Sequence, residues 1–122
     1  MARILLIDDD ELMRGMMLQM LTQDGHQVSS ATDGEEGLAM SKTVKPDLII
    51  TDVLMPKMDG IEMIMELHKI HSSIPIVAMS GGRRAVSAEF NLESASLVGV
   101  KATLAKPFTR ADLRSAIEKA LR

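Results

Sequence analysis

The sequence predicts an α/β fold, a doubly wound, five-stranded parallel sheet with helices on both faces. Short apolar runs alternate along the chain with longer amphipathic stretches. Continuous apolar strands separated by helices are typical of a parallel sheet that is covered on both sides. The 122 residues also contain no linker, low-complexity segment or repeat, so residues 1–122 are expected to form one domain.

Each predicted strand is a short apolar run, and a predicted helix follows it. The strands are expected at residues 3–7, 27–31, 47–51, 74–79 and 101–105. The helices are expected over 11–23, from 32 to about 43, from 59, near 88–98 and from 109. Three helix starts combine a capping residue with an acid three positions later: Thr32 with Glu35, Asp59 with Glu62, and Thr109 with Asp112. Gly99 is the expected C-terminal cap of the fourth helix.

Apolar residues at helical spacing predict which face of each helix turns to the core. In the first helix we interpret the methionine stripe as core rather than as partner surface, although it is wide enough for part of it to be exposed: Met13, Met16, Met17 and Met20. The third helix carries the apolar residues Ile61, Ile64, Met65 and Leu67. The last is expected to bury Leu113, Ala116, Ile117, Ala120 and Leu121.

Composition excludes several classes of function. The net charge of -3 and the lack of a Lys/Arg run argue against nucleic acid as the main partner. The chain has no cysteine, so neither a disulfide framework nor thiolate chemistry is expected. The apolar run near the N-terminus is too short for a signal peptide or a membrane span. A cytoplasmic protein without membrane contact is therefore expected.

Polar residues follow the predicted strands where each strand ends. Three carboxylates follow the first strand, Asp52 follows the third, Ser80 the fourth and Lys106 the fifth. The carboxyl ends of parallel strands share one edge of the sheet, where ligands bind. Clustered carboxylates suit a hard cation such as Mg²⁺. A lysine and a hydroxyl beside that ion would complete a phosphoryl-binding site, with Asp52 as the nucleophilic carboxylate.

The loop after Asp52 has its own signal. Pro56 restricts its own backbone and that of Met55. We expect this stiff segment to aim the Leu54 carbonyl at the metal.

Asp10 is interpreted as the cap of the first helix rather than as a metal ligand, since acids are favoured at a helix N-terminus. Arg83 and Arg84 are interpreted as a solvated pair, against the hypothesis that one reaches the phosphoryl group.

Four motifs occur in order on these elements: ILLIDDDELMR, PDLIITDVLMPKMDG, PIVAMSGG and LAKPF. Over the whole chain they resemble the receiver domain of two-component response regulators. The resemblance implies a flavodoxin-like sheet with strand order 2-1-3-4-5. It also implies Mg²⁺-dependent transfer of a phosphoryl group from a kinase phosphohistidine to an aspartate, followed by hydrolysis, rather than conventional enzymatic turnover.

The resemblance also implies a role for each residue of the motifs. Asp52 is the phosphoacceptor. The metal is held directly by Asp9, largely through water by Asp8, and also by Asp52 and by the Leu54 carbonyl. The phosphoryl group is contacted by the Ser80 hydroxyl, the Gly81 N–H and Lys106. A cis peptide is implied between Lys106 and Pro107.

The implied partners are a sensor histidine kinase or a histidine phosphotransfer protein, and an unidentified downstream protein. Phosphorylation is expected to switch the 80–108 region for partner binding or phosphorelay. Thr103 stands where the family often has an aromatic switch residue. Since nothing follows the last predicted helix, the chain is expected to carry no output domain, which resembles the stand-alone receivers.

Two alternatives compete with this interpretation. A haloacid-dehalogenase-type phosphohydrolase also starts with an Asp-x-Asp motif, which Asp8-Asp9-Asp10 matches. Such an enzyme needs a further acidic motif after its lysine, and after Lys106 only Asp112 and Glu118 remain. The second alternative is a degenerate receiver that binds partners without phosphorylation; the complete set of site residues argues against it.

Overall fold

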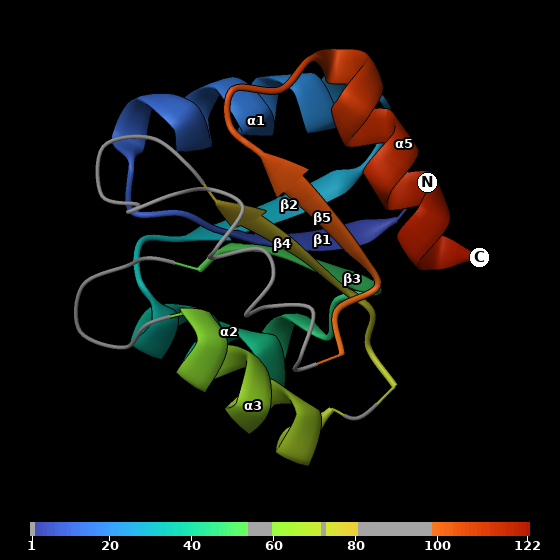
Figure 1. The fold of residues 1–122 in the computed structure, drawn as a ribbon. Helices are drawn as coiled ribbons and strands as arrows, with labels where there is room; N and C mark the ends of the chain where they lie inside the picture. The colour runs from blue at the N-terminus through green and yellow to red at the C-terminus, as the bar shows by residue number, and fades with distance from the viewer. Residues whose placement is uncertain (1, 54–59, 72, 81–98) are drawn as a thin grey trace.

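The fold is built around one parallel sheet (Figure 1). The computed structural model describes residues 2–53, 60–71, 73–80 and 99–122. The five strands are β1 (Arg3–Ile7), β2 (Gln27–Ala31), β3 (Leu48–Asp52), β4 (Ile76–Ser80) and β5 (Ala102–Ala105). Their order is β2-β1-β3-β4-β5, and every neighbouring pair is parallel. The predicted sheet and the strand order implied by the resemblance are both confirmed.

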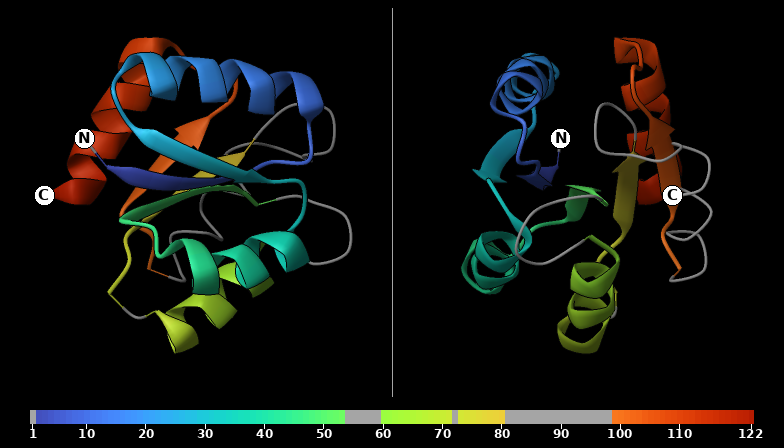
Figure 2. Two further views of the ribbon diagram at one scale, coloured as in Figure 1. Left: turned by 180° about the vertical axis from the view of Figure 1, so that it is seen from behind. Right: turned by 60° about the vertical axis from the view of Figure 1, so that its left-hand side comes forward.

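Helices cover both faces of this sheet. The described helices are α1 (Glu11–Gln23), α2 (Gly34–Val44), α3 (Gly60–Ile70) and α5 (Arg110–Leu121). Figure 2 shows α1 and α5 on one face and α2 and α3 on the other. The helix predicted near 88–98 lies outside the described residues. Gly99, its predicted cap, has a φ of +83°, in the left-handed region that favours glycine.

The core is divided into two clusters by the sheet itself. Alternate residues of a strand point to opposite faces, so Ile4 and Leu6 of β1 pack with α1 and α5. Leu5 and Ile7 of the same strand pack with α3 on the other face. All four side chains are fully buried. The central strands are therefore held from both sides, which gives the carboxyl ends of β1 and β3 a rigid base.

Two of the three predicted capping boxes lie within the described residues. At α5 the box is confirmed, since Asp112 N donates to Thr109 Oγ1 and Thr109 N donates to Asp112 Oδ2, both at 3.0 Å. At α2 the prediction of Thr32 as the cap is wrong by one residue, because Asp33 caps the helix and accepts from Glu36 N at 2.8 Å. Thr32 and Asp33 are both good capping residues with a glutamate three positions later, so their spacing alone does not separate them.

Three residues of the predicted apolar stripes are exposed: Met16 by 56%, Met65 by 51% and Leu121, which was predicted to face the core, by 43%. Each predicted stripe was wider than the line along which its helix meets the sheet. In α1 the buried residues are Met17 and Leu21, with Met13 and Met20 packed at their edge. In α3 the fully buried residues include Met63, which the sequence pattern missed.

Gly37 and Gly15 form a matched pair for a stability test. A Cβ on Gly37 of α2 would lie 2.8 Å from Ile7 Cγ1, whereas one on Gly15 of α1 would meet nothing within 4 Å. Gly37→Ala is expected to lower the free energy of unfolding by about 1–2 kcal/mol, because overpacking outweighs the gain in helix propensity. Gly15→Ala is expected to raise it by up to about 1 kcal/mol. Urea denaturation measures both, and stabilisation by both variants would contradict the proposed clash.

An ion-pair cluster joins the C-terminal end of α1 to α5. Asp24 accepts from Arg110 Nη2 at 2.6 Å and from Arg114 Nη2 at 2.8 Å. The hydrogen bonds from Arg114 and Arg110 hold the pKa of the Asp24 carboxyl well below its usual range. The same contact raises the pKa of Arg114.

This cluster predicts how folding stability depends on pH. The pKa of Asp24 is lower in the folded than in the unfolded chain, so the ion pairs stabilise the fold above about pH 4. That contribution is lost as the pH falls below this value. Asp24→Asn is expected to lower the urea midpoint at neutral pH, and the two proteins should converge in acid. A difference that stays constant down to about pH 2.5 would contradict this assignment.

Candidate functional site

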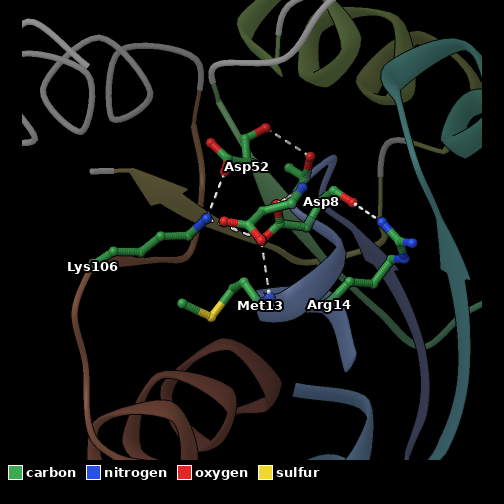
Figure 3. Close-up of polar contacts among 7 residues, drawn as sticks. Asp8, Met13, Arg14, Asp52 and Lys106 are labelled. Carbon is green, nitrogen blue, oxygen red and sulfur yellow. Dashed lines mark hydrogen bonds and ion pairs between the residues drawn. The ribbon is translucent and has the colours of Figure 1, made fainter. Parts of the chain in front are cut away.

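The fold brings residues from three strand ends to one rim of the sheet. Asp8 directly follows β1, Asp52 is the last residue of β3, and Lys106 directly follows β5. β1 and β3 are neighbours, whereas β5 lies two strands beyond β3. The long lysine side chain spans this gap. Its Nζ donates to Asp52 Oδ2 at 2.7 Å and to Asp8 Oδ2 at 3.0 Å (Figure 3).

The three charged side chains are largely withdrawn from water. The exposed fraction is 0% for the side chain of Asp8, 8% for that of Asp52 and 10% for that of Lys106. Burial raises the pKa of the Asp8 carboxyl, although the hydrogen bond from Asp10 N and the charge of Lys106 act in the opposite direction. Burial also acts to lower the pKa of Lys106, but its contacts with Asp52 and Asp8 outweigh burial and raise it. The lysine is therefore a stable cation at neutral pH.

A third carboxylate completes an acidic cluster. Asp8, Asp9 and Asp52 each offer a carboxylate oxygen, and these atoms all lie within 4.8 Å of one another. Asp9 is half-buried. One ammonium cannot neutralise three carboxylates, and oxygen ligands are those that hard divalent cations prefer. The residues present therefore fit a divalent metal ion.

Hydrogen bonds hold Asp8 on several sides. Its N–H donates to Ala31 O at 3.2 Å, which continues the ladder between β1 and β2 by one residue. Its Oδ1 accepts from Asp10 N at 2.9 Å, and its main-chain carbonyl accepts from Arg14 Nη1 at 2.9 Å. Arg14 has no signal in the sequence that marks it as a site residue, because an arginine in the first turns of a helix can extend its side chain in several directions.

Asp10 has the role that the sequence predicted. It caps α1, where its Oδ1 accepts from Met13 N at 3.2 Å. The strand that precedes it has ended at Ile7, so Asp8, Asp9 and Asp10 form the connection into the helix. Asp8 and Asp9 contribute carboxylates to the rim of the sheet, whereas Asp10 caps α1.

The structure describes some of the other predicted site residues but not all of them. Ser80 is the last residue of β4 and is paired with Ala105 of β5, so its backbone lies at the same rim. The peptide between Lys106 and Pro107 is cis, as the resemblance implied. Thr103 is exposed on β5. Leu54, Gly81, Arg83 and Arg84 lie outside the described residues.

The three histidines do not join the acidic cluster. His26, His68 and His71 are each half-buried. His26 has a structural contact, in which its Nδ1 accepts from Ala2 N at 3.0 Å. A single sequence gives no signal for such a contact, because the partner is a backbone group 24 residues away.

Comparison with known proteins identifies this arrangement. The family model of the response regulator receiver domain matches residues 4–118. The chain belongs to the response regulator receiver family. Such domains receive phosphoryl groups from histidine kinases, so this receiver domain has the function of a two-component response regulator. Its membership removes the phosphohydrolase alternative.

Relatives of this receiver domain include both long and short proteins. It is 33% identical over 120 residues to the alkaline phosphatase synthesis transcriptional regulatory protein PhoP of Bacillus subtilis. The aligned region covers 98% of this chain and 48% of PhoP. It is 34% identical to the chemotaxis protein CheY of Thermotoga maritima, with 96% and 95% covered. It thus spans about half the length of PhoP but nearly all of that CheY.

Solved structures agree with this grouping. A response regulator receiver domain protein from Clostridium thermocellum superposes with a TM-score of 0.90 at 31% identity, covering 99% of this chain and 94% of that one. The chemotaxis protein CheY4 of Vibrio cholerae gives a TM-score of 0.87 at 31% identity, with 99% of both chains covered. In the described part of the receiver, no helix has the length and apolarity needed to cross a bilayer.

Proposed function

We propose that this receiver domain accepts a phosphoryl group onto Asp52 from the phosphohistidine of a sensor histidine kinase or a histidine phosphotransfer protein. The observation that carries the proposal is the position of Asp52. Its carboxylate lies at the end of a central strand, 2.7 Å from the Lys106 ammonium and beside two further carboxylates. A buried carboxylate with a cation at hydrogen-bond distance is positioned to attack a phosphorus atom.

The metal of the site is proposed to be Mg²⁺. Asp9 and Asp52 would hold it directly, Asp8 largely through water, and Leu54 through its carbonyl. When bound, Mg²⁺ supplies positive charge beside the phosphoryl oxygens. The oxygen-only donor set and the excess of carboxylates over cations support this choice.

The chain's own residues carry the transfer. A carboxylate oxygen of Asp52 forms a bond to phosphorus while the phosphorus–nitrogen bond of the phosphohistidine breaks, and the imidazole leaves with the electron pair. The Lys106 ammonium turns from the carboxylates to the phosphoryl oxygens. The Ser80 hydroxyl and the Gly81 N–H bind the same oxygens. Hydrolysis by water then restores the carboxylate and releases inorganic phosphate.

The phosphoryl group is proposed to switch the 80–108 region. It adds negative charge and acceptor oxygens at the rim to which Lys106 and Ser80 belong. The changed surface would bind a downstream protein or pass the phosphoryl group onward, and a cytoplasmic location would give access to a kinase.

The test is intact-mass spectrometry after incubation with acetyl phosphate. One added phosphoryl group is expected with Mg²⁺ and none with EDTA. If no adduct forms, beryllofluoride, which mimics a bound phosphoryl group, separates fast hydrolysis from a degenerate receiver. A protein that forms no adduct and binds no beryllofluoride would refute the proposal, as would an adduct that forms equally in EDTA.

A further inference from the structure

The half-buried Arg14 connects α1 to the acidic rim. Its backbone N–H makes an early bond of α1, to Asp10 O at 2.9 Å. Side chains on a helix tilt toward its N-terminus, so the guanidinium runs back toward the end of β1. There Nη1 donates to the main-chain carbonyl of Asp8 at 2.9 Å (Figure 3).

The carbonyl that Arg14 contacts lies just past the regular sheet. The pairing of β1 with both of its neighbours ends at Ile7. The contact of the Asp8 N–H with Ala31 O extends the ladder by one donor. Arg14 supplies the Asp8 carbonyl with a charged donor, and a charge-assisted hydrogen bond is stronger and more directional than a neutral one.

This contact bears on two carboxylates at once. The peptide bond is planar, so the Asp8 carbonyl and the Cα of Asp9 lie in one plane. Fixing the direction of that carbonyl therefore fixes where the Asp9 side chain begins. The Asp8 carboxylate is meanwhile held by Asp10 N and by Lys106 Nζ. Without Arg14, the Asp8–Asp9 peptide can rotate and separate oxygens that now lie within 4.8 Å of one another.

We propose that Arg14 is a positioning residue that orients the Asp8–Asp9 peptide, and thereby the carboxylates of the proposed Mg²⁺ site. It acts through the backbone and touches neither the metal nor the phosphoryl group. This inference rests on the proposed function, because it assigns the group that keeps the metal ligands together. Loss of such an outer partner typically weakens metal binding about 10–100-fold.

The test compares Mg²⁺ affinity among purified variants by isothermal titration calorimetry. Arg14→Met keeps an apolar stem but removes the donor, and a dissociation constant about 10–100-fold higher than that of the wild type is expected. Arg14→Lys keeps a donor of similar reach and should recover most of the affinity. Arg3→Met is the matched control, since it removes the same charge from the exposed, opposite end of β1 and should leave affinity close to that of the wild type.

A second measurement separates positioning from general stability. The ¹³C chemical shift of the Asp8 carbonyl should move in Arg14→Met and return toward the wild-type value in Arg14→Lys. If Arg14→Met does not fold, Arg14→Gln takes its place, because its amide ends two bonds short of the guanidinium. Unchanged Mg²⁺ affinity in a folded variant would overturn this inference and leave the proposed function standing. A wild-type protein that binds no Mg²⁺ would overturn both.

Discussion

Asp52→Asn is expected to abolish phosphoryl uptake from acetyl phosphate while the fold stays intact. Asparagine has nearly the same shape, and its amide oxygen can still accept the hydrogen bond that Lys106 Nζ now donates at 2.7 Å. The amide is not a nucleophile, so no bond to phosphorus forms. Intact-mass spectrometry should show no adduct in the variant under conditions that modify the wild type.

Asp47→Asn is the matched control for this variant. Asp47 directly precedes β3, so the same charge is removed at the exposed, opposite end of the strand that ends in Asp52. An asparagine there keeps an oxygen that can accept from Arg3 N, as Asp47 Oδ2 does at 2.8 Å. This control should take up one phosphoryl group. An adduct of equal yield in Asp52→Asn would place the acceptor on another residue, with Asp8 and Asp9 as the next candidates.

Lys106→Met is expected to lower the free energy of unfolding at neutral pH by about 3 kcal/mol in the absence of divalent metal. Methionine fills a similar volume but leaves two buried carboxylates, Asp8 and Asp52, without their cation. Removal of one partner from a buried ion pair costs more than the pair contributes, because the charge left behind remains desolvated. Urea denaturation monitored by circular dichroism gives the difference.

The loss in Lys106→Met should depend on pH and on Mg²⁺. Burial already raises the pKa of Asp8, and loss of the lysine raises it further, so the folded variant gains protons more readily than the unfolded chain. Its deficit in stability is therefore present at neutral pH and shrinks as the pH falls toward about 5. Millimolar Mg²⁺ should stabilise the variant more than the wild type, because the metal then neutralises carboxylates that lack an ammonium.

The control for this substitution is Lys69→Met. Lys69 pairs with Glu66 at 3.2 Å on the surface of α3, and its side chain is 71% exposed. Such pairs contribute less than about 0.5 kcal/mol, so little change is expected at any pH. A deficit in Lys106→Met that is the same at neutral and acidic pH would show that lost packing, rather than unpaired carboxylates, destabilises the variant.

The sequence allowed much of the fold to be predicted because its strands are short apolar runs with clear ends. β1 and β2 coincide with the predicted residues, whereas β3 begins one residue later and β4 two residues later than expected. Once the strands are parallel, topology gathers their carboxyl ends, and the acidic cluster of Asp8, Asp9 and Asp52 follows. Periodicity was weaker for the helices, since it does not show how wide a face the sheet covers, and Met16 and Met65 turned out to be exposed.

The contacts inside the site were less predictable than its residues. The resemblance implied that Lys106 contacts a phosphoryl group, and in this structure its ammonium bridges Asp8 and Asp52. Arg14 could not be selected at all, because its acceptor is a backbone carbonyl and carries no signature in the sequence. Side-chain direction and burial decide such contacts, and both depend on packing that a single sequence does not contain.

The ion pair between Asp8 and Lys106 has a consequence for how the domain is made. It joins two residues that lie 98 positions apart, close to the beginning and the end of the chain. Contacts between such distant positions form late, because the intervening loop has to be closed first. Asp8 is synthesised long before Lys106, so a nascent chain cannot assemble the site early. The site is therefore complete only when the first and the last strand of the sheet are both in place.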